Sequence, residues 1–103
     1  MVCGASVVSR YRRRVDGNQK RVVGELRQLG CYVEPGLSRV GHGVPDLLVG
    51  YKGRWHVVEL KDPDQPPSKQ VLSPDEKVWH EKAGPFAHVI IATTTEEIME
   101  RIR

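Results

Sequence analysis

Two stretches decide the fold of this chain: Gly43-Val-Pro-Asp-Leu-Leu-Val-Gly50 and His56-Val-Val-Glu-Leu-Lys61. Each contains an apolar run of strand length, and the glycine-containing turn between them predicts a β-hairpin. Asp46 stands at the start of the first strand, and Glu59 and Lys61 stand at the end of the second. Because the start of one hairpin strand lies beside the end of its partner, we expect these three side chains to lie close together.

Glu59 and Lys61 are two residues apart, so they point to the same face of an extended strand. Together with Asp46 they place two carboxylates and one ammonium group at one edge of a small sheet. Carboxylates bind hard divalent cations, and an ammonium group beside them can act on a phosphate or on an attacking water. The alternative is that Asp46 only caps a turn, while Glu59 and Lys61 form a solvated pair.

The elements around the hairpin predict an α/β fold of the order α-β-β-β-α-β-α. Capping boxes at Asp16 and Ser73 predict the starts of two helices, and Gly30 is a natural C-terminal cap for the first. We expect a central mixed four-stranded sheet flanked by helices. The predicted helices span residues 16–30, 73–83 and 94 or 95–102, and the predicted strands span residues 31–34, 46–49, 55–61 and 86–92.

The length of 103 residues predicts a single domain, and 39% hydrophobic with 28% charged residues is typical of a folded globular protein. The net charge of +3 is unevenly distributed, because Arg12, Arg13 and Arg14 lie in a basic N-terminal arm over residues 1–14. Such an arm suits DNA phosphates, although chain ends are often simply solvated. We assign residues 15–103 to the folded domain.

Cysteine usage and hydropathy point to a cytoplasmic protein. Cys3 and Cys31 form no zinc-binding pattern with the four histidines. No stretch approaches the roughly 18 apolar residues of a membrane-spanning helix. We therefore expect a chain with reduced thiols and no membrane partner.

The Pro-Asp and Glu-x-Lys motifs, with a helix and a three-stranded meander around them, resemble the PD-(D/E)XK nuclease superfamily. The segments Gly41-His-Gly-Val-Pro-Asp46, Glu59-Leu-Lys61 and Leu72-Ser-Pro-Asp-Glu76 resemble the small stand-alone VRR-NUC proteins of phages and prophages. The similarity runs from about residue 15 to residue 98. It implies a restriction-endonuclease-like core and a divalent-metal-dependent endonuclease, often acting on branched or junction DNA in a bacterial cytoplasm.

The resemblance also implies roles for individual residues. Asp46 and Glu59, with the backbone carbonyl of Leu60, would bind Mg²⁺ or Mn²⁺, and Lys61 would act on the attacking water. Gln19 occupies a helix position where related nucleases carry a metal-ligating glutamate, so we include it in the catalytic set. Its alternative role is to close the capping box with Asp16, and Glu25 is an alternative carboxylate on the same helix.

Contacts with nucleic acid are expected at Arg12, Arg13 and Arg14, at His42 in a glycine-flanked loop, and at Lys69 after a proline-rich loop. Glu76 either serves the site or only caps its helix. Trp55, Trp79 and Phe86 are interpreted as core or interface residues, and the resemblance implies a homodimer. Two alternatives stay open: a non-catalytic nucleic-acid-binding module of the same fold, and a regulatory subunit whose arm binds an acidic protein.

Overall fold

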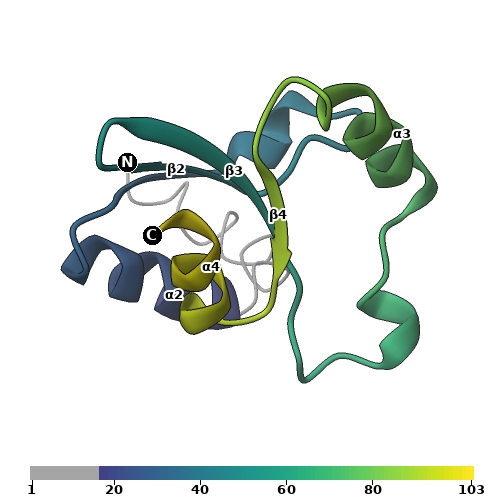
Figure 1. The fold of residues 1–103 in the computed structure, drawn as a ribbon. Helices are drawn as coiled ribbons and strands as arrows, with labels where there is room; N and C mark the ends of the chain where they lie inside the picture. The colour runs from purple at the N-terminus through teal and green to yellow at the C-terminus, as the bar shows by residue number, and fades with distance from the viewer. Residues whose placement is uncertain (1–16) are drawn as a thin grey trace, which may run out of the picture.

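The computed structural model describes residues 17–103, which form a four-stranded sheet with helices around it (Figure 1). The strand order is β1-β2-β3-β4, with β1–β2 and β2–β3 antiparallel and β3–β4 parallel. This confirms the predicted α/β fold with a three-stranded meander and a mixed sheet. The strands are β1 Tyr32–Pro35, β2 Leu47–Tyr51, β3 Arg54–Leu60 and β4 Val89–Ala92.

The helices lie in two places. Helices α2 (Gly17–Gln28) and α4 (Thr95–Ile102) cover one face of the sheet, whereas α3 (Pro74–Ala83) stands apart beyond β4 (Figure 1). Two short 3-10 turns, η1 (Leu37–Val40) and η2 (Pro67–Lys69), lie in the connecting loops. No residue of α3 is buried, so this helix contributes a surface rather than part of the core.

The core lies between the sheet and the α2–α4 pair. Val22 and Leu26 are fully buried on α2, as their helical spacing predicts, and they meet Leu47, Val58 and Ile90 of the sheet in one cluster. Burying each such side chain contributes roughly 1.5–3 kcal/mol.

Leu29 continues the predicted apolar spacing of the first helix but is not part of the core. Helix α2 ends at Gln28, so Leu29 lies in the turn that follows, and it is 48% exposed. The helical pattern therefore runs one residue further in the sequence than the helix itself.

Local capping sets the starts of α3 and α4. Ser73 caps α3 through a reciprocal capping box with Glu76, as predicted. Of the two predicted caps for the last helix, Thr94 is the one observed, and it forms its own capping box with Glu97. The predicted cap Asp16 lies outside the described residues.

The last strand begins later than predicted. The predicted strand over residues 86–92 is shortened to β4, because the backbone amides of Phe86 and Ala87 bond to the carbonyl of Ala83 in a turn after α3. Phe86 is 90% exposed and Trp55 is 61% exposed, so neither is a core residue, and the interface alternative stays a prediction for both. Trp79 is half-buried on α3.

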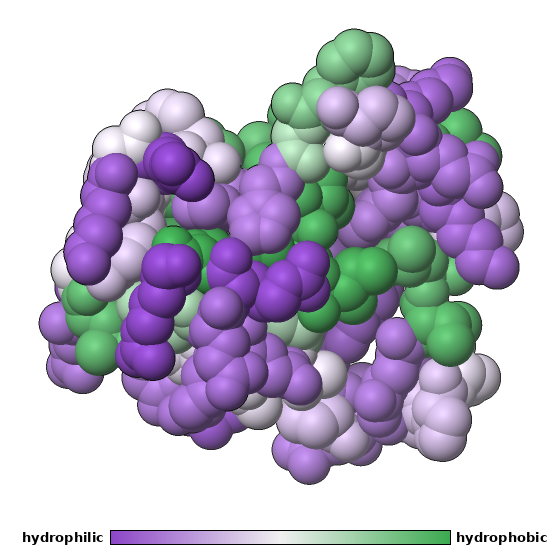
Figure 2. All heavy atoms as spheres, in the orientation of Figure 1, coloured by the Kyte–Doolittle hydropathy of each residue, from purple (hydrophilic) through white to green (hydrophobic). Residues whose placement is uncertain are grey.

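The surface is mostly hydrophilic, as expected for a chain in which 28% of the residues are charged. Hydrophilic residues make up most of the face in Figure 2, and apolar residues appear as a broken band across its middle. Within residues 17–103, no helix combines the length and the hydropathy needed to cross a membrane.

Candidate active site

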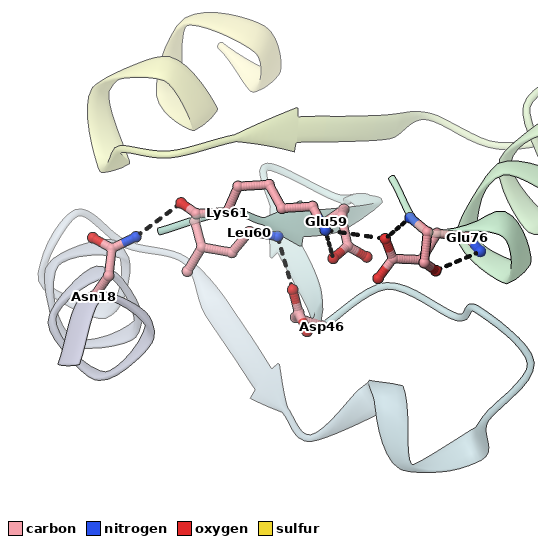
Figure 3. Close-up of polar contacts among 7 residues, drawn as sticks. Asn18, Asp46, Glu59, Leu60, Lys61 and Glu76 are labelled. Carbon is pink, nitrogen blue, oxygen red and sulfur yellow. Dashed lines mark hydrogen bonds and ion pairs between the residues drawn. The ribbon is translucent and has the colours of Figure 1, made fainter. Parts of the chain in front are cut away.

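The candidate site lies where β2 begins and β3 ends. Asp46 directly precedes β2, and the pairing of Leu47 with Val58 brings it beside the end of β3. Its Oδ2 atom accepts a hydrogen bond of 2.9 Å from the backbone N–H of Leu60. Glu59 and Lys61 lie on either side of Leu60, so the structure brings together the three side chains that the hairpin predicts (Figure 3).

Glu76 joins these residues from α3. The Lys61 Nζ atom lies 3.0 Å from Glu76 Oε1 and 3.4 Å from Glu59 Oε2. The same Glu76 Oε1 atom accepts a hydrogen bond of 2.8 Å from the backbone N–H of Ser73. The two readings of Glu76 are therefore compatible, because this carboxylate caps α3 and also holds the Lys61 ammonium group.

Glu59 is buried in an unfavourable electrostatic position. Its side chain is almost inaccessible, with 3% of the residue exposed, and among residues 17–103 its Oε1 atom has no hydrogen-bond partner. Burial, followed by the charges of Asp46 and Glu76, raises the pKa of Glu59 to about 8. Burial likewise raises the pKa of Asp46, although the Leu60 N–H opposes this shift.

The partners of Lys61 keep its ammonium group charged. Burial alone would lower the pKa of Lys61, but the hydrogen bond to Glu76 and the charge of Glu59 outweigh it and raise that pKa. Burial would raise the pKa of Glu76, yet the Ser73 N–H and Lys61 lower it overall. Within this cluster of described residues, the three carboxylates of Asp46, Glu59 and Glu76 share the one ammonium group of Lys61, so their negative charge is only partly compensated.

The donor set fits a hard divalent cation. In the described part of the chain, no three His, Cys, Asp or Glu side chains are grouped to hold a metal by themselves. Mg²⁺ takes only one or two protein carboxylates and keeps several waters, so Asp46 and Glu59 are sufficient. The carbonyl of Leu60 points to the same side of β3 as its N–H, which bonds Asp46, and so adds a backbone oxygen at this edge.

Asn18 is a residue of the site region that the sequence interpretation missed. It is buried in the first turn of α2, and its Nδ2 donates to the carbonyl of Lys61, at 3.2 Å (Figure 3), and to that of Thr93, at 3.1 Å. The amide ties α2 to the segments that follow β3 and β4. Asn18 precedes Val22 by four residues, so the helical spacing could have placed it on the buried face.

The remaining predicted site residues lie on α2, in or next to loops, or outside the described residues. Gln19 is half-buried in the first turn of α2, next to Asn18, and its catalytic role stays a prediction. The alternative carboxylate Glu25 accepts a hydrogen bond from the Thr95 hydroxyl of α4. His42 and Lys69 are exposed, in the loop before Asp46 and at the end of η2 respectively. Arg12, Arg13 and Arg14 lie outside the described residues.

Comparison with known proteins gives one informative match. No family model matches this sequence, and the curated proteins contain no match. Among solved structures, the chain is similar to one described as a VRR_NUC domain, with 26% sequence identity and a TM-score of 0.59. The match covers 82% of this chain and 89% of that chain, and it suggests a nuclease. The protein therefore has a VRR-NUC-like fold of the PD-(D/E)XK type, as its motifs indicate.

Proposed function

We propose that this protein is a divalent-metal-dependent endonuclease that hydrolyses phosphodiester bonds in DNA. The observation that carries the proposal is the buried Glu59 carboxylate beside Asp46, with an oxygen that lacks a partner within residues 17–103. A bound cation would satisfy that oxygen and offset the charge of both carboxylates. The similarity to a VRR_NUC domain supports the same reaction class.

Each residue of the site has a role in this proposal. Asp46, Glu59 and the Leu60 carbonyl would hold Mg²⁺ or Mn²⁺, and the Leu60 N–H fixes the orientation of Asp46. When bound, such an ion polarises phosphoryl oxygens and lowers the pKa of water. Lys61 places a positive charge where the attacking water and the developing phosphate charge would lie. Its contact with Glu76 limits the positions that its ammonium group can take.

The proposed substrate is branched or junction DNA, cut by a homodimer in the cytoplasm of a bacterial host of a phage or prophage. The basic arm, with Arg12, Arg13 and Arg14, would bind phosphates without regard to sequence. His42 and Lys69 are exposed and would add phosphate contacts nearer the domain. The similarity to a VRR_NUC domain and the net charge of +3 support a DNA partner.

Nicking of supercoiled plasmid tests the proposed reaction. The wild-type protein should convert the plasmid to open circles with Mg²⁺ or Mn²⁺ and lose this activity when the metal is chelated. Glu59→Gln keeps the shape of the side chain but removes a ligand charge, so it should abolish nicking. Glu81→Gln, an exposed position of α3, is the matched control and should nick at the wild-type rate.

Two results would contradict the proposal. Nicking that persists in Glu59→Gln, or that needs no metal, would show that the chemistry lies elsewhere. DNA binding by a wild-type protein that never nicks would favour the alternative of a non-catalytic binding module.

A further inference from the structure

Helix α2 begins at the same edge of the sheet as the candidate active site, and a buried amide fixes it there. The Nδ2 atom of Asn18 donates to the carbonyl of Lys61, which follows β3, and to that of Thr93, which follows β4. These two hydrogen bonds use both hydrogens of the amide. Its Oδ1 atom is an acceptor and serves a third partner.

That partner is Arg21, whose Nη2 atom donates to Asn18 Oδ1 at 2.5 Å. Two hydrogen bonds, joined by the Asn18 amide, therefore connect the guanidinium group to the carbonyl of Lys61. Arg21 follows Asn18 by three residues, and helical side chains lean towards the N-terminus of their helix, so the contact suits the local geometry. A buried amide that is itself tied to two strand ends thus holds the guanidinium in one place.

The charge of Arg21 is not neutralised by a carboxylate within residues 17–103. Both ion pairs among these residues belong to Lys61. Glu97 lies beside Thr93, but its carboxylate accepts hydrogen bonds from the Thr93 N–H and hydroxyl. The first turn of α2 contains no acidic residue, and Arg21 is exposed. A guanidinium group has five N–H donors, so the ones that do not bond Asn18 can bind a ligand.

We propose that Arg21 binds a DNA phosphate on the α2 side of the active site, beside the phosphate that would be cut at Asp46 and Glu59. A planar guanidinium group can donate two parallel N–H bonds to one phosphate, and Asn18 is the positioning residue that presents it. This inference rests on the proposed nuclease function and extends it, because it assigns a substrate contact next to the reacting group.

A carboxylate of an acidic protein would also attract this positive charge. The hydrogen-bonded link to Lys61 favours DNA, because a strand whose phosphate lies at the candidate active site passes along the same sheet edge. We therefore commit to a DNA phosphate and treat an acidic protein as an outcome of the test.

The salt dependence of DNA binding tests this contact. A labelled duplex is titrated without divalent metal, so that nothing is cleaved, and binding is followed by anisotropy over a range of salt concentrations. Arg21→Gln should bind about 10-fold more weakly at low salt, the lower end of the effect of a hydrogen bond to a charged group. It should also reduce the magnitude of the slope of log K against log salt by about 0.9, the contribution of one phosphate.

Two further variants separate geometry from charge. Arg21→Lys keeps the charge but lacks the planar fork, so it should keep the wild-type slope and still bind more weakly than wild type. Arg101→Gln removes the same charge from an exposed position in the last turn of α4 and should bind as the wild type does.

Several results would overturn the contact. Wild-type affinity and slope in Arg21→Gln would do so, and so would weaker binding with an unchanged slope, since the loss would then involve no phosphate. If Arg21→Gln does not fold, wild-type affinity in Arg21→Lys would overturn the planar fork. Binding of polyglutamate that Arg21→Gln weakens, with DNA binding unchanged, would overturn the contact in favour of an acidic protein. If the wild type nicks plasmid in these cases, only this inference fails, whereas a wild type that never nicks removes the proposed function itself.

Discussion

Lys61 is the residue whose surroundings most constrain its role. Its ammonium group contacts Glu76 at 3.0 Å and Glu59 at 3.4 Å, and both contacts favour the charged form. A group fixed in this way beside the proposed metal ligands acts mainly where charge changes during the reaction. Interactions of that kind stabilise the transition state more than the bound substrate.

Lys61→Ala should therefore lower the cleavage rate strongly and DNA affinity little. We expect a fall of about 10²- to 10³-fold in the single-turnover rate at saturating DNA, the typical effect of losing one electrostatic donor. Lys82→Ala, on the exposed surface of α3, controls for the loss of a positive charge. Equal rates for Lys61→Ala and wild type at saturating DNA would show that the assigned role is wrong.

The sequence predicted the side chains of the site better than the long-range contacts that hold them in place. Asp46, Glu59 and Lys61 could be grouped because hairpin pairing and the alternation of side chains along a strand depend only on nearby residues. Asn18 could not be linked to Lys61 in this way, since their contact joins residues 43 positions apart through the packing of α2. The ring contact of His56 with His88, whose Nδ1 atoms are 2.8 Å apart, depends likewise on the parallel β3–β4 pairing.

Among the elements, the loop before β2 controls the placement of α3. Gly43 has a φ of +81°, and a methyl group on it would overlap the backbone of Asp75 and Glu76 at the start of α3. The loop and the helix therefore pack backbone against backbone. Because Glu76 holds Lys61, this contact positions the ammonium group at the site.

Gly43→Ala should slow cleavage, because the added methyl group pushes Glu76 away from Lys61. Gly41 is a matched control, since its φ is +88° but a methyl group there has no atom within 4 Å. Both variants should lose roughly 1–3 kcal/mol of stability because their positive φ disfavours a side chain, and Gly43→Ala should lose more because of its overlap with the backbone of α3. Thermal unfolding and single-turnover cleavage together separate the two effects, and equal rates for the two variants would refute this positioning.

Element boundaries were predictable where the signal is local. The caps at Ser73 and Thr94 involve neighbouring residues, so sequence alone located the start of α3 and, to within one residue, the start of α4. The start of β4 was missed because an apolar Phe86 looks like a strand residue, whereas its backbone amide bonds to the carbonyl of Ala83 in the turn after α3. Burial of an apolar residue depends on the partner element, and the pattern alone does not contain that information.

For the whole molecule, the basic N-terminal arm should provide salt-sensitive binding. Each phosphate neutralised contributes about −0.9 to the slope of log K against log salt on duplex DNA. Deleting residues 1–14 should flatten that slope, which a binding titration over a range of salt concentrations measures. An unchanged slope would mean that the arm does not contact DNA.

The active form should be a homodimer. A four-way junction has two symmetric strands to cut, and a two-fold dimer presents two sites to them. Light scattering at micromolar concentration should give about twice the chain mass of 11.6 kDa. A clean monomer that still cuts both strands of a four-way junction symmetrically would exclude this arrangement.

The global fold followed from the element order, but the surface did not. A hairpin, a meander and one crossover leave few ways to order four strands, and the predicted mixed sheet is observed. The edge-to-face contact between Tyr32 of β1 and Trp55 of β3, in contrast, crosses the intervening β2. Such a surface depends on strand register, which sequence patterns did not specify here.

Binding of Mn²⁺ by calorimetry tests the central claim most directly, because it needs no DNA. The wild type should bind one ion per chain, and Asp46→Asn should bind at least about 10-fold more weakly, a loss that even outer-shell substitutions cause. Asp64→Asn removes the same charge from an exposed loop and should bind as the wild type does. Wild-type Mn²⁺ affinity in Asp46→Asn would contradict the assignment of the metal site.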